Sequence, residues 1–239
     1  MINAENPRKS KVIVALDVPC AKDISPLISQ IPDEIEWYKV GLELFISEGN
    51  QAIEILTGMN KRIFLDLKLH DIPRTVERAV KTASQHSVGL LTVHASGGPA
   101  MLRAAATAAA ECDNPPLIVA VTALTSLDQS DLTALGVSRD LKEHARALGR
   151  LAVDSGIDGL VCSPHEAAAL RGDLGPAPIL VTPGIRMPEG ELGDQKRVAT
   201  PADAVAAGSD FLVVGRPIVQ ADNPGSAARK ILDQMYSAR

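Results

Sequence analysis

The sequence of 239 residues predicts a single domain, residues 1–239, folded as an α/β protein of the (β/α)8 TIM-barrel class. Short aliphatic runs alternate with Ala- and Leu-rich amphipathic stretches, and about eight such runs occur, the number of strands in a closed parallel barrel. No Ser- or Gly-rich linker interrupts this alternation. Aromatic residues make up only 3% of a chain that is 46% hydrophobic. Small aliphatic side chains must therefore fill the core, which suits parallel strands covered by helices on both faces.

Each predicted strand is an aliphatic segment bounded by a polar or Gly/Pro break. In chain order these segments are residues 12–16, 36–40, 62–67, 89–94, 117–122, 159–162, 179–182 and 211–214. The predicted helices include residues 43–56, 75–85, 99–112 and 141–154, and residues 223–236 form the closing helix. An open, doubly wound sheet would show the same alternation. However, no Gly-x-Gly-x-x-Gly follows the first strand, which weakens a dinucleotide-binding version of that fold.

Composition excludes several functional classes. The net charge is −5 and there is no basic stripe, so we expect no nucleic-acid partner. No apolar run approaches the ~20 residues needed to span a membrane, and the polar N-terminal segment lacks the apolar region of a signal peptide. The three cysteines, Cys20, Cys112 and Cys162, are far apart, which disfavours a disulfide framework or a zinc site. We expect a cytoplasmic protein with reduced thiols and no metal.

Polar and glycine residues gather where the predicted strands end. In TIM barrels the active site lies at the C-terminal ends of the strands. The strand-end residues here are Asp17, Lys39, Asp66, Lys68, His94, Ser96, Thr122, Ser163, Thr182, Gly215 and Arg216. The sequence therefore predicts a reactive site at this end of the barrel.

The third predicted strand carries charges within an apolar run. Asp66 and Lys68 are two residues apart, a spacing that puts both side chains on the same face of an extended strand. Asp71 follows in the turn before the next helix, and Pro73 suits the first turn of that helix. With Lys39 they predict an alternating array of Lys39, Asp66, Lys68 and Asp71. Such charges are expensive unless paired or functional, so the array is either an active site or a buried ion-pair network that fixes barrel packing.

Two loops predict a phosphate site. The seventh strand runs into a Thr-Pro-Gly-Ile-Arg segment that ends at Arg186, and the eighth runs into Gly215 and Arg216. Loops after strands seven and eight commonly bind phosphate in this fold. Glycine lets the backbone approach an anion, and arginine adds charge-assisted hydrogen bonds. The alternative for either loop alone is an ordinary turn with a surface arginine.

The polar segment 186–197 is long for a connection in a compact barrel. Long loops at the catalytic face often act as lids, and from such a lid Gln195 would reach the ligand. The alternative is a disordered surface insertion. His94 and His70 lie beside the charged residues, and we interpret both as structural histidines rather than general bases.

Together these segments resemble the orotidine 5′-phosphate decarboxylase family in its common bacterial form. The matching segments run from the first strand, ending at Asp17, to the Gly-Arg-Pro-Ile segment after the eighth. The most specific segment is Asp-Leu-Lys-Leu-His-Asp-Ile-Pro-Arg-Thr-Val, residues 66–76. The resemblance implies a cofactor-free enzyme that converts orotidine monophosphate (OMP) to uridine monophosphate (UMP), the last step of UMP biosynthesis.

The resemblance also implies roles for individual residues. Lys68 is similar to the lysine that protonates C6 of the pyrimidine, and Asp66 to the aspartate beside the departing carboxylate. The remaining roles fall into four groups: ribose contacts (Asp17 and Lys39), groups supplied by the neighbouring subunit of a homodimer (Asp71, Ile72 and Thr75), a loop near the pyrimidine (Thr125 and Ser126), and phosphate or other substrate contacts (Arg186, Gln195, Gly215 and Arg216).

Two other readings stay open at this stage. Relatives that act on sugar phosphates, as magnesium-dependent decarboxylases or aldolases, share the Asp-x-Lys-x-x-Asp pattern and use the metal to stabilise an enediolate. A non-catalytic nucleotide-binding barrel would keep the phosphate loops and lose the lysine and aspartates, all of which this chain retains.

Overall fold

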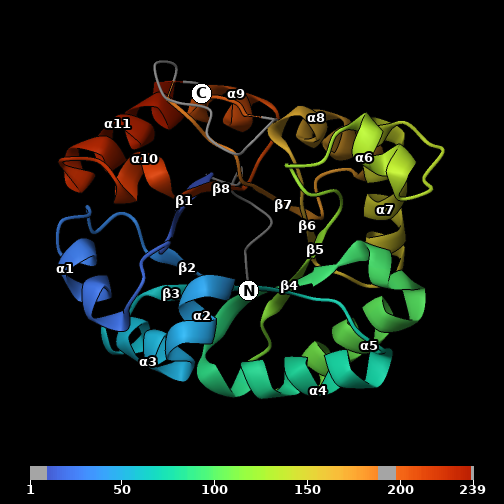
Figure 1. Cartoon of the computed structure of the whole chain (residues 1–239), viewed down its shortest axis with the longest axis horizontal. Helices are drawn as coiled ribbons and strands as arrows, with labels where there is room; N and C mark the ends of the chain where they lie inside the picture. Colours follow the sequence, from blue (N-terminus) through green and yellow to red (C-terminus); the bar gives the residue numbers. More distant parts are fainter. Residues whose placement is uncertain (1–9, 188–197, 238–239) are drawn as a thin grey trace.

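The computed structural model, which describes residues 10–187 and 198–237, is a closed barrel of eight parallel strands (Figure 1). Each strand pairs with the next along the chain, and β1 pairs with β8 to close the barrel. The strands are β1 (Lys11–Ala15), β2 (Trp37–Gly41), β3 (Arg62–Leu69), β4 (Val88–His94), β5 (Leu117–Val121), β6 (Gly159–Val161), β7 (Ile179–Thr182) and β8 (Phe211–Val214). All eight predicted strands are therefore confirmed, with ends that move by a residue or two, and the TIM-barrel class is confirmed with them.

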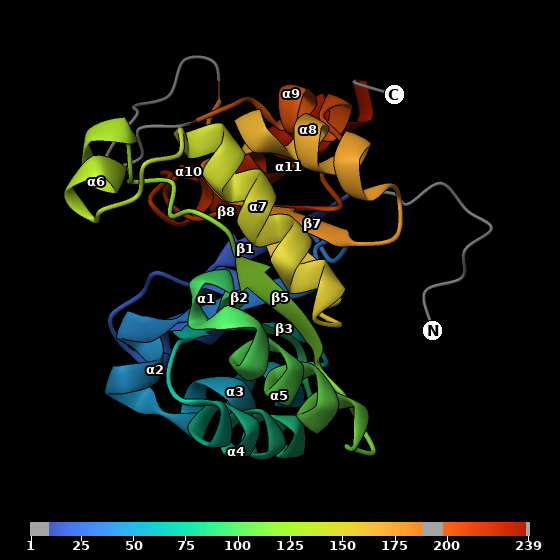
Figure 2. The same ribbon diagram turned by 90° about the vertical axis from the view of Figure 1, so that its right-hand side faces the viewer.

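Helices surround the barrel, and the side view shows α7 covering its outside between α5 and α8 (Figure 2). The α-helices are α1 (Ile24–Ile28), α2 (Leu42–Glu48), α3 (Asn50–Gly58), α4 (Pro73–Ala83), α5 (Gly98–Ala110), α6 (Gln129–Ala134), α7 (Leu141–Asp154), α8 (Pro164–Leu174), α9 (Pro201–Ala206), α10 (Arg216–Val219) and α11 (Pro224–Ser237). The described residues also form short 3-10 helices, η1 (Ala21–Asp23), η2 (Ser84–His86) and η3 (Ala95–Gly97). Within the described ranges, no helix is both long and apolar enough to cross a lipid bilayer.

The prediction of one continuous helix over residues 43–56 was wrong. The structure has two helices there, α2 and α3, joined at Gly49. Gly49 has a φ of 58°, a left-handed conformation that glycine adopts without steric penalty. The apolar periodicity continues through the break, which is why the sequence pattern did not reveal it.

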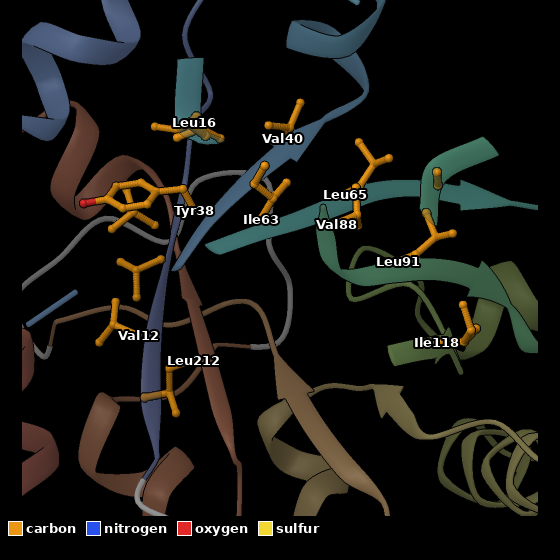
Figure 3. Close-up of a cluster of buried hydrophobic side chains, with 14 of the residues drawn as sticks. Val12, Leu16, Tyr38, Val40, Ile63, Leu65, Val88, Leu91, Ile118 and Leu212 are labelled. Atoms are coloured by element: carbon orange, nitrogen blue, oxygen red, sulfur yellow. The ribbon is translucent and has the colours of Figure 1, made fainter. Parts of the chain in front are cut away.

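Successive side chains of a strand point to opposite faces, so the strands divide the core into two apolar layers. One set of side chains fills the barrel interior, where Trp37 and Phe211 pack edge to face with ring centroids 5.2 Å apart. The other set faces the helices and forms the larger layer, part of which is shown in Figure 3. Tyr38 belongs to this outer layer and is fully buried, and burial raises the pKa of its phenol.

The N-terminal ends of β7 and β8 are held by a buried carboxylate. Asp210, before β8, accepts a hydrogen bond from the backbone N–H of Leu180 at 2.8 Å and pairs with the Arg171 guanidinium at 2.7 Å. Arg171 also donates to the backbone carbonyls of Gly175, Pro178 and Gly208. This network ties α8, β7 and β8 together at the end of the barrel that, in this fold, serves stability rather than chemistry.

Candidate active site

A cavity of about 620 Å³ opens at the C-terminal ends of the strands. Its walls come from the strand ends and the loops that follow them. The lining residues are Ala15, Asp17, Lys39, Glu43, Phe64, Asp66, Lys68, Val121, Ala123, Leu124, Thr125, Val161, Cys162, Pro183, Gly184, Arg186, Val213, Gly215, Arg216 and Gln220. Phe64, Val121, Val161 and Val213 are also part of the interior apolar layer, so the cavity has an apolar floor with polar groups around it.

Charged side chains from the first three strands form a row along one wall. The Lys39 ammonium lies 3.4 Å from Asp17 Oδ1 and 3.8 Å from Asp66 Oδ2. Lys68 Nζ donates to both carboxylate oxygens of Asp66 at 2.9 Å. Exposure of the side chains rises toward the ends of the row, from 11% at Asp66 and 12% at Lys39 to 29% at Lys68 and 50% at Asp17. Signs alternate along the row, so each inner charge has an opposite neighbour in a partly desolvated site.

Two glycines leave room for this row. A Cβ atom on Gly41 would lie 2.7 Å from Lys39 Nζ, and one on Gly215 would lie 2.8 Å from Asp17 Oδ2. Both separations are shorter than van der Waals contact. The positions of the Asp17 and Lys39 charges therefore depend on the absence of side chains at these two residues.

The backbone at Lys68 departs from the extended strand that the two-residue spacing assumes. Lys68 has a φ of 51°, a left-handed conformation that is rare for a residue with a side chain. In the pairing of β3 with β4, Leu65 is opposite Leu91 while Leu69 is opposite Val93, so β3 carries two extra residues at this point. Asp66 and Lys68 do meet, but at an irregularity of the kind that re-aims side chains next to functional sites.

The predicted phosphate residues follow β7 and β8, and Gly215 lies beside Asp17 because β8 pairs with β1. Arg186, Gly215 and Arg216 all line the cavity, and Arg186 is buried. Beyond β7, Arg186 donates its backbone N–H to Ala199, and Ala199 donates to Gly184, which holds the two sides of this loop together. Gln195 and most of the predicted lid lie outside the described residues.

The loop after β5 is only partly in the cavity. Thr125 and Leu124 line it, whereas Ser126 is exposed and is not among the lining residues. Asp71, Ile72 and Thr75 are also exposed and outside this cavity, and Ile72 is 67% exposed. The Asp71 carboxylate accepts the backbone N–H of Ile72 at 2.6 Å. The array that the sequence predicts is thus assembled within one chain from Lys39, Asp66 and Lys68, without Asp71.

The two histidines near the charged row contact each other. The rings of His70 and His94 have centroids 5.4 Å apart, and neither residue is among those lining the cavity. Burial, followed by the proximity of His70, lowers the pKa of His94 below its ordinary value. Both effects favour the neutral form of the His94 imidazole.

Some residues at the strand ends have structural tasks that the sequence argument did not separate from chemistry. Ser163 caps α8 in a capping box with Glu166. The hydroxyls of Thr122 and Thr182 donate to backbone carbonyls of the adjacent strands. Conversely, Glu43, Cys162 and Gln220 line the cavity without having been predicted as site residues. Two of them carried a signal in the sequence: Glu43 ends the segment 38–43, which matches the family, and Cys162 ends the sixth predicted strand.

No group of three or more His, Cys, Asp or Glu side chains is arranged to hold a metal ion within residues 10–187 and 198–237. The polar lining residues are suited instead to an anionic organic ligand, with two lysines and two arginines facing one cavity. Electrostatic attraction between these cations and a phosphate or carboxylate is strong in a partly desolvated pocket.

Comparison with known proteins gives the family. The profile of the orotidine 5′-phosphate decarboxylase / HUMPS family matches residues 10–231. The chain belongs to this family. An orotidine 5′-phosphate decarboxylase of Anaeromyxobacter sp. (strain K) is 47% identical over 222 residues, which cover 92% of this chain and 96% of the relative. One of Halorhodospira halophila is 46% identical over 97% of this chain and 98% of its own length.

A solved structure agrees with the sequence comparison. The crystal structure of orotidine 5′-phosphate decarboxylase from Lactobacillus acidophilus superposes with a TM-score of 0.83 and 36% identity, covering 95% of this chain and 99% of the other. The family resemblance seen in the sequence is therefore confirmed. The relatives' names favour the decarboxylase over the alternative of a sugar-phosphate enzyme.

Proposed function

We propose that this chain is a carboxy-lyase that decarboxylates OMP to UMP and CO2 and so completes UMP biosynthesis. The observation that carries the proposal is the Lys68 ammonium, hydrogen bonded at 2.9 Å to both oxygens of Asp66 in a cavity whose other side carries Arg186 and Arg216. A proton donor and a carboxylate lie at one side of the pocket, and guanidinium groups suited to a phosphate lie at the other. The family membership supports the same reaction.

The reaction breaks the bond between C6 of the pyrimidine and its carboxylate carbon. CO2 leaves, and the electron pair of that bond stays on C6 as a carbanion that the ring cannot easily delocalise. A fixed ammonium at Lys68 stabilises the developing negative charge and then transfers a proton to C6. The neutral amine regains its proton from water, so the enzyme returns to its starting state without a cofactor.

Asp66 has two roles in this proposal. Its carboxylate orients the Lys68 ammonium through two hydrogen bonds. It also faces the substrate carboxylate, and relief of that repulsion as CO2 departs favours the transition state over the ground state. Asp17 and Lys39 continue the charged row, and we assign them to the ribose hydroxyls. Thr125 and Ser126 are assigned to the loop near the pyrimidine, where Thr125 lines the cavity.

The substrate phosphate would bind at Gly215, Arg216 and Gln195, with Arg186 as a further substrate contact. Glycine permits close approach of the backbone to the anion, and Arg216 adds charge-assisted hydrogen bonds. Because the phosphate is remote from C6, its binding energy can close the active site and drive the chemical step.

We further propose that the working unit is a cytoplasmic homodimer. Asp71, Ile72 and Thr75 are all exposed and lie outside the cavity of their own chain, as expected of groups that complete the site of a neighbouring subunit. Burial of Ile72 in that interface would shield from water a large apolar side chain that is 67% exposed in the single chain. An inactive Asp71 variant should then regain activity when it is mixed with an inactive Lys68 variant. In each hybrid dimer, one site combines an unchanged Lys68 from one subunit with an unchanged Asp71 from the other.

The decisive test follows the absorbance change as OMP becomes UMP, with EDTA present, for wild type, Lys68→Ala and a control, Lys81→Ala. Lys81 is also an ion-paired lysine, but it pairs with Glu77 and Glu111 on the outer helices. We expect rapid conversion by wild type and the control and near-abolition in Lys68→Ala, with UMP binding retained. Absence of conversion by a folded, dimeric wild type would overturn the proposal, and sugar phosphates with magnesium would then be assayed.

A further inference from the structure

Lys68 is held in a conformation that its own strand does not provide. Of the three non-glycine residues with positive φ in the described chain, it is the one within a strand; Asn60 and Ser87 lie in turns or beside short helices. Left-handed backbone at a residue with a side chain persists only when the surroundings determine it. Some contact must therefore fix Lys68 in place.

That contact is made by Thr92 on β4. The backbone N–H of Lys68 donates to Thr92 Oγ1 at 2.7 Å, and Thr92 Oγ1 lies 3.1 Å from Asp66 Oδ1. An N–H group can only donate and an ionised carboxylate can only accept. The hydroxyl must therefore accept from Lys68 and donate to Asp66. With the ammonium of Lys68 on the same carboxylate, these groups form a closed ring of hydrogen bonds.

Thr92 itself is fully buried and is not among the residues that line the cavity. It lies opposite Val119 in the pairing of β4 with β5. Its β-branched side chain has few rotamers, so the hydroxyl is held in one direction by the strand that carries it. Thr92 can thus influence the reaction only through Lys68 and Asp66.

We propose that Thr92 is a positioning residue of the decarboxylation site. Its hydroxyl fixes the left-handed backbone of Lys68 and the carboxylate of Asp66, and so sets where the ammonium meets C6 of the substrate. This inference rests on the proposed function for its catalytic consequence, whereas the hydrogen-bond ring itself does not depend on the substrate. A purely space-filling role would need only the volume of the side chain, so the two explanations make different predictions for isosteric variants.

The first experiment compares Thr92→Val, which keeps the shape and removes the hydroxyl, with Thr92→Ser, which keeps the hydroxyl. The control is Thr122→Val, another buried barrel threonine; its hydroxyl donates to the Val161 carbonyl, which the Thr122 N–H continues to bond in the variant. We expect Thr92→Val to lower kcat about a hundredfold, the scale of a 1 Å misplacement, with little change in KM for OMP or in UMP binding. Thr92→Ser should recover most of the loss.

Equal losses in the valine and serine variants would overturn the proposal, as would a Thr92→Val enzyme no slower than Thr122→Val. Emission from Trp37, the single tryptophan, and thermal unfolding report whether each variant folds. If valine is not tolerated in the core, Thr92→Ala removes the same hydroxyl with less bulk and is read in the same way.

A second measurement keeps this proposal separate from the substrate assignment. Hydrogen exchange of the Lys68 amide, followed without any nucleotide, should be faster in Thr92→Val than in wild type and restored by serine. Unchanged protection of that amide would overturn the positioning role even if OMP is the substrate. Failure of the wild type to convert OMP, with faster exchange in Thr92→Val, would refute the proposed function and retain the hydrogen-bond ring.

Discussion

Gly41→Ala should separate activity from stability in this enzyme. Gly41 has a φ of −93° and a ψ of −178°, an extended conformation that alanine adopts without strain. The added Cβ would lie 2.7 Å from Lys39 Nζ, so the ammonium, at the end of a flexible side chain, must move by about 1 Å to reach van der Waals separation. The substitution displaces a charge without distorting the backbone.

The magnitude follows from the charged row. At an effective dielectric constant of about 20, moving Lys39 Nζ from 3.8 Å to about 4.8 Å from Asp66 Oδ2 weakens their attraction by roughly 1 kcal/mol. The half-exposed Asp17 carboxylate adds less because water screens it. We therefore expect kcat/KM for OMP to fall about fivefold. Over the same change the free energy of unfolding should stay within about 1 kcal/mol of wild type, because the restriction of the unfolded chain by alanine offsets the weaker ion pair.

The assay is OMP decarboxylation together with urea unfolding followed by Trp37 emission. The control is Gly172→Ala in α8, where an added Cβ meets no atom within 4 Å; it should gain stability and keep full activity. An unchanged kcat/KM in Gly41→Ala would refute the claim that the Lys39 position matters. A loss of stability well above about 1 kcal/mol would refute the claim that the side chain, rather than the backbone, gives way.

Two other predictions concern stability. Arg171→Met leaves the mostly buried Asp210 carboxylate without its guanidinium partner. The free energy of unfolding should fall by about 3 kcal/mol, while the activity per folded molecule is kept. A fall of less than about 1 kcal/mol would show that the pair is dispensable. Burial and the proximity of His70 lower the pKa of His94 in the folded state. As the pH falls below about 6.5, the unfolded chain therefore binds a proton at this histidine before the folded chain does, and the free energy of unfolding decreases. His94→Gln should show a smaller loss between pH 7 and pH 5, and an unchanged loss would assign it to other groups.

The fold could be predicted because its signals are local and repeated. Eight aliphatic runs with polar breaks were enough to place the strands, and small errors at their ends reflect tertiary contacts. The wrong prediction of one helix over residues 43–56 has a physical cause. Gly49 divides a periodic helix through its backbone conformation, and conformation at a single glycine leaves no trace in apolar periodicity.

Part of the cavity lining could be predicted from the sequence, but its geometry could not. Asp66 and Lys68 stand out as charges in an apolar strand, and they do meet. Their meeting depends on two extra residues in β3 and a left-handed Lys68, which spacing along one strand cannot reveal. Thr92 was missed for the same reason. A buried threonine in a strand is unremarkable until the register across the irregularity brings its hydroxyl to Lys68 and Asp66.

The pairing of β1 with β8 has a consequence for how the protein is made. Val14 lies opposite Val214, so roughly 200 residues must be synthesised before the first strand meets its second neighbour. At translation rates of about 5–20 residues per second, that interval is about 10–40 s. Until then β1 presents an unpaired edge, the kind of template on which other chains aggregate. Fragments ending before Phe211 should therefore be insoluble, and the nascent chain should depend on protection that the closed barrel no longer needs.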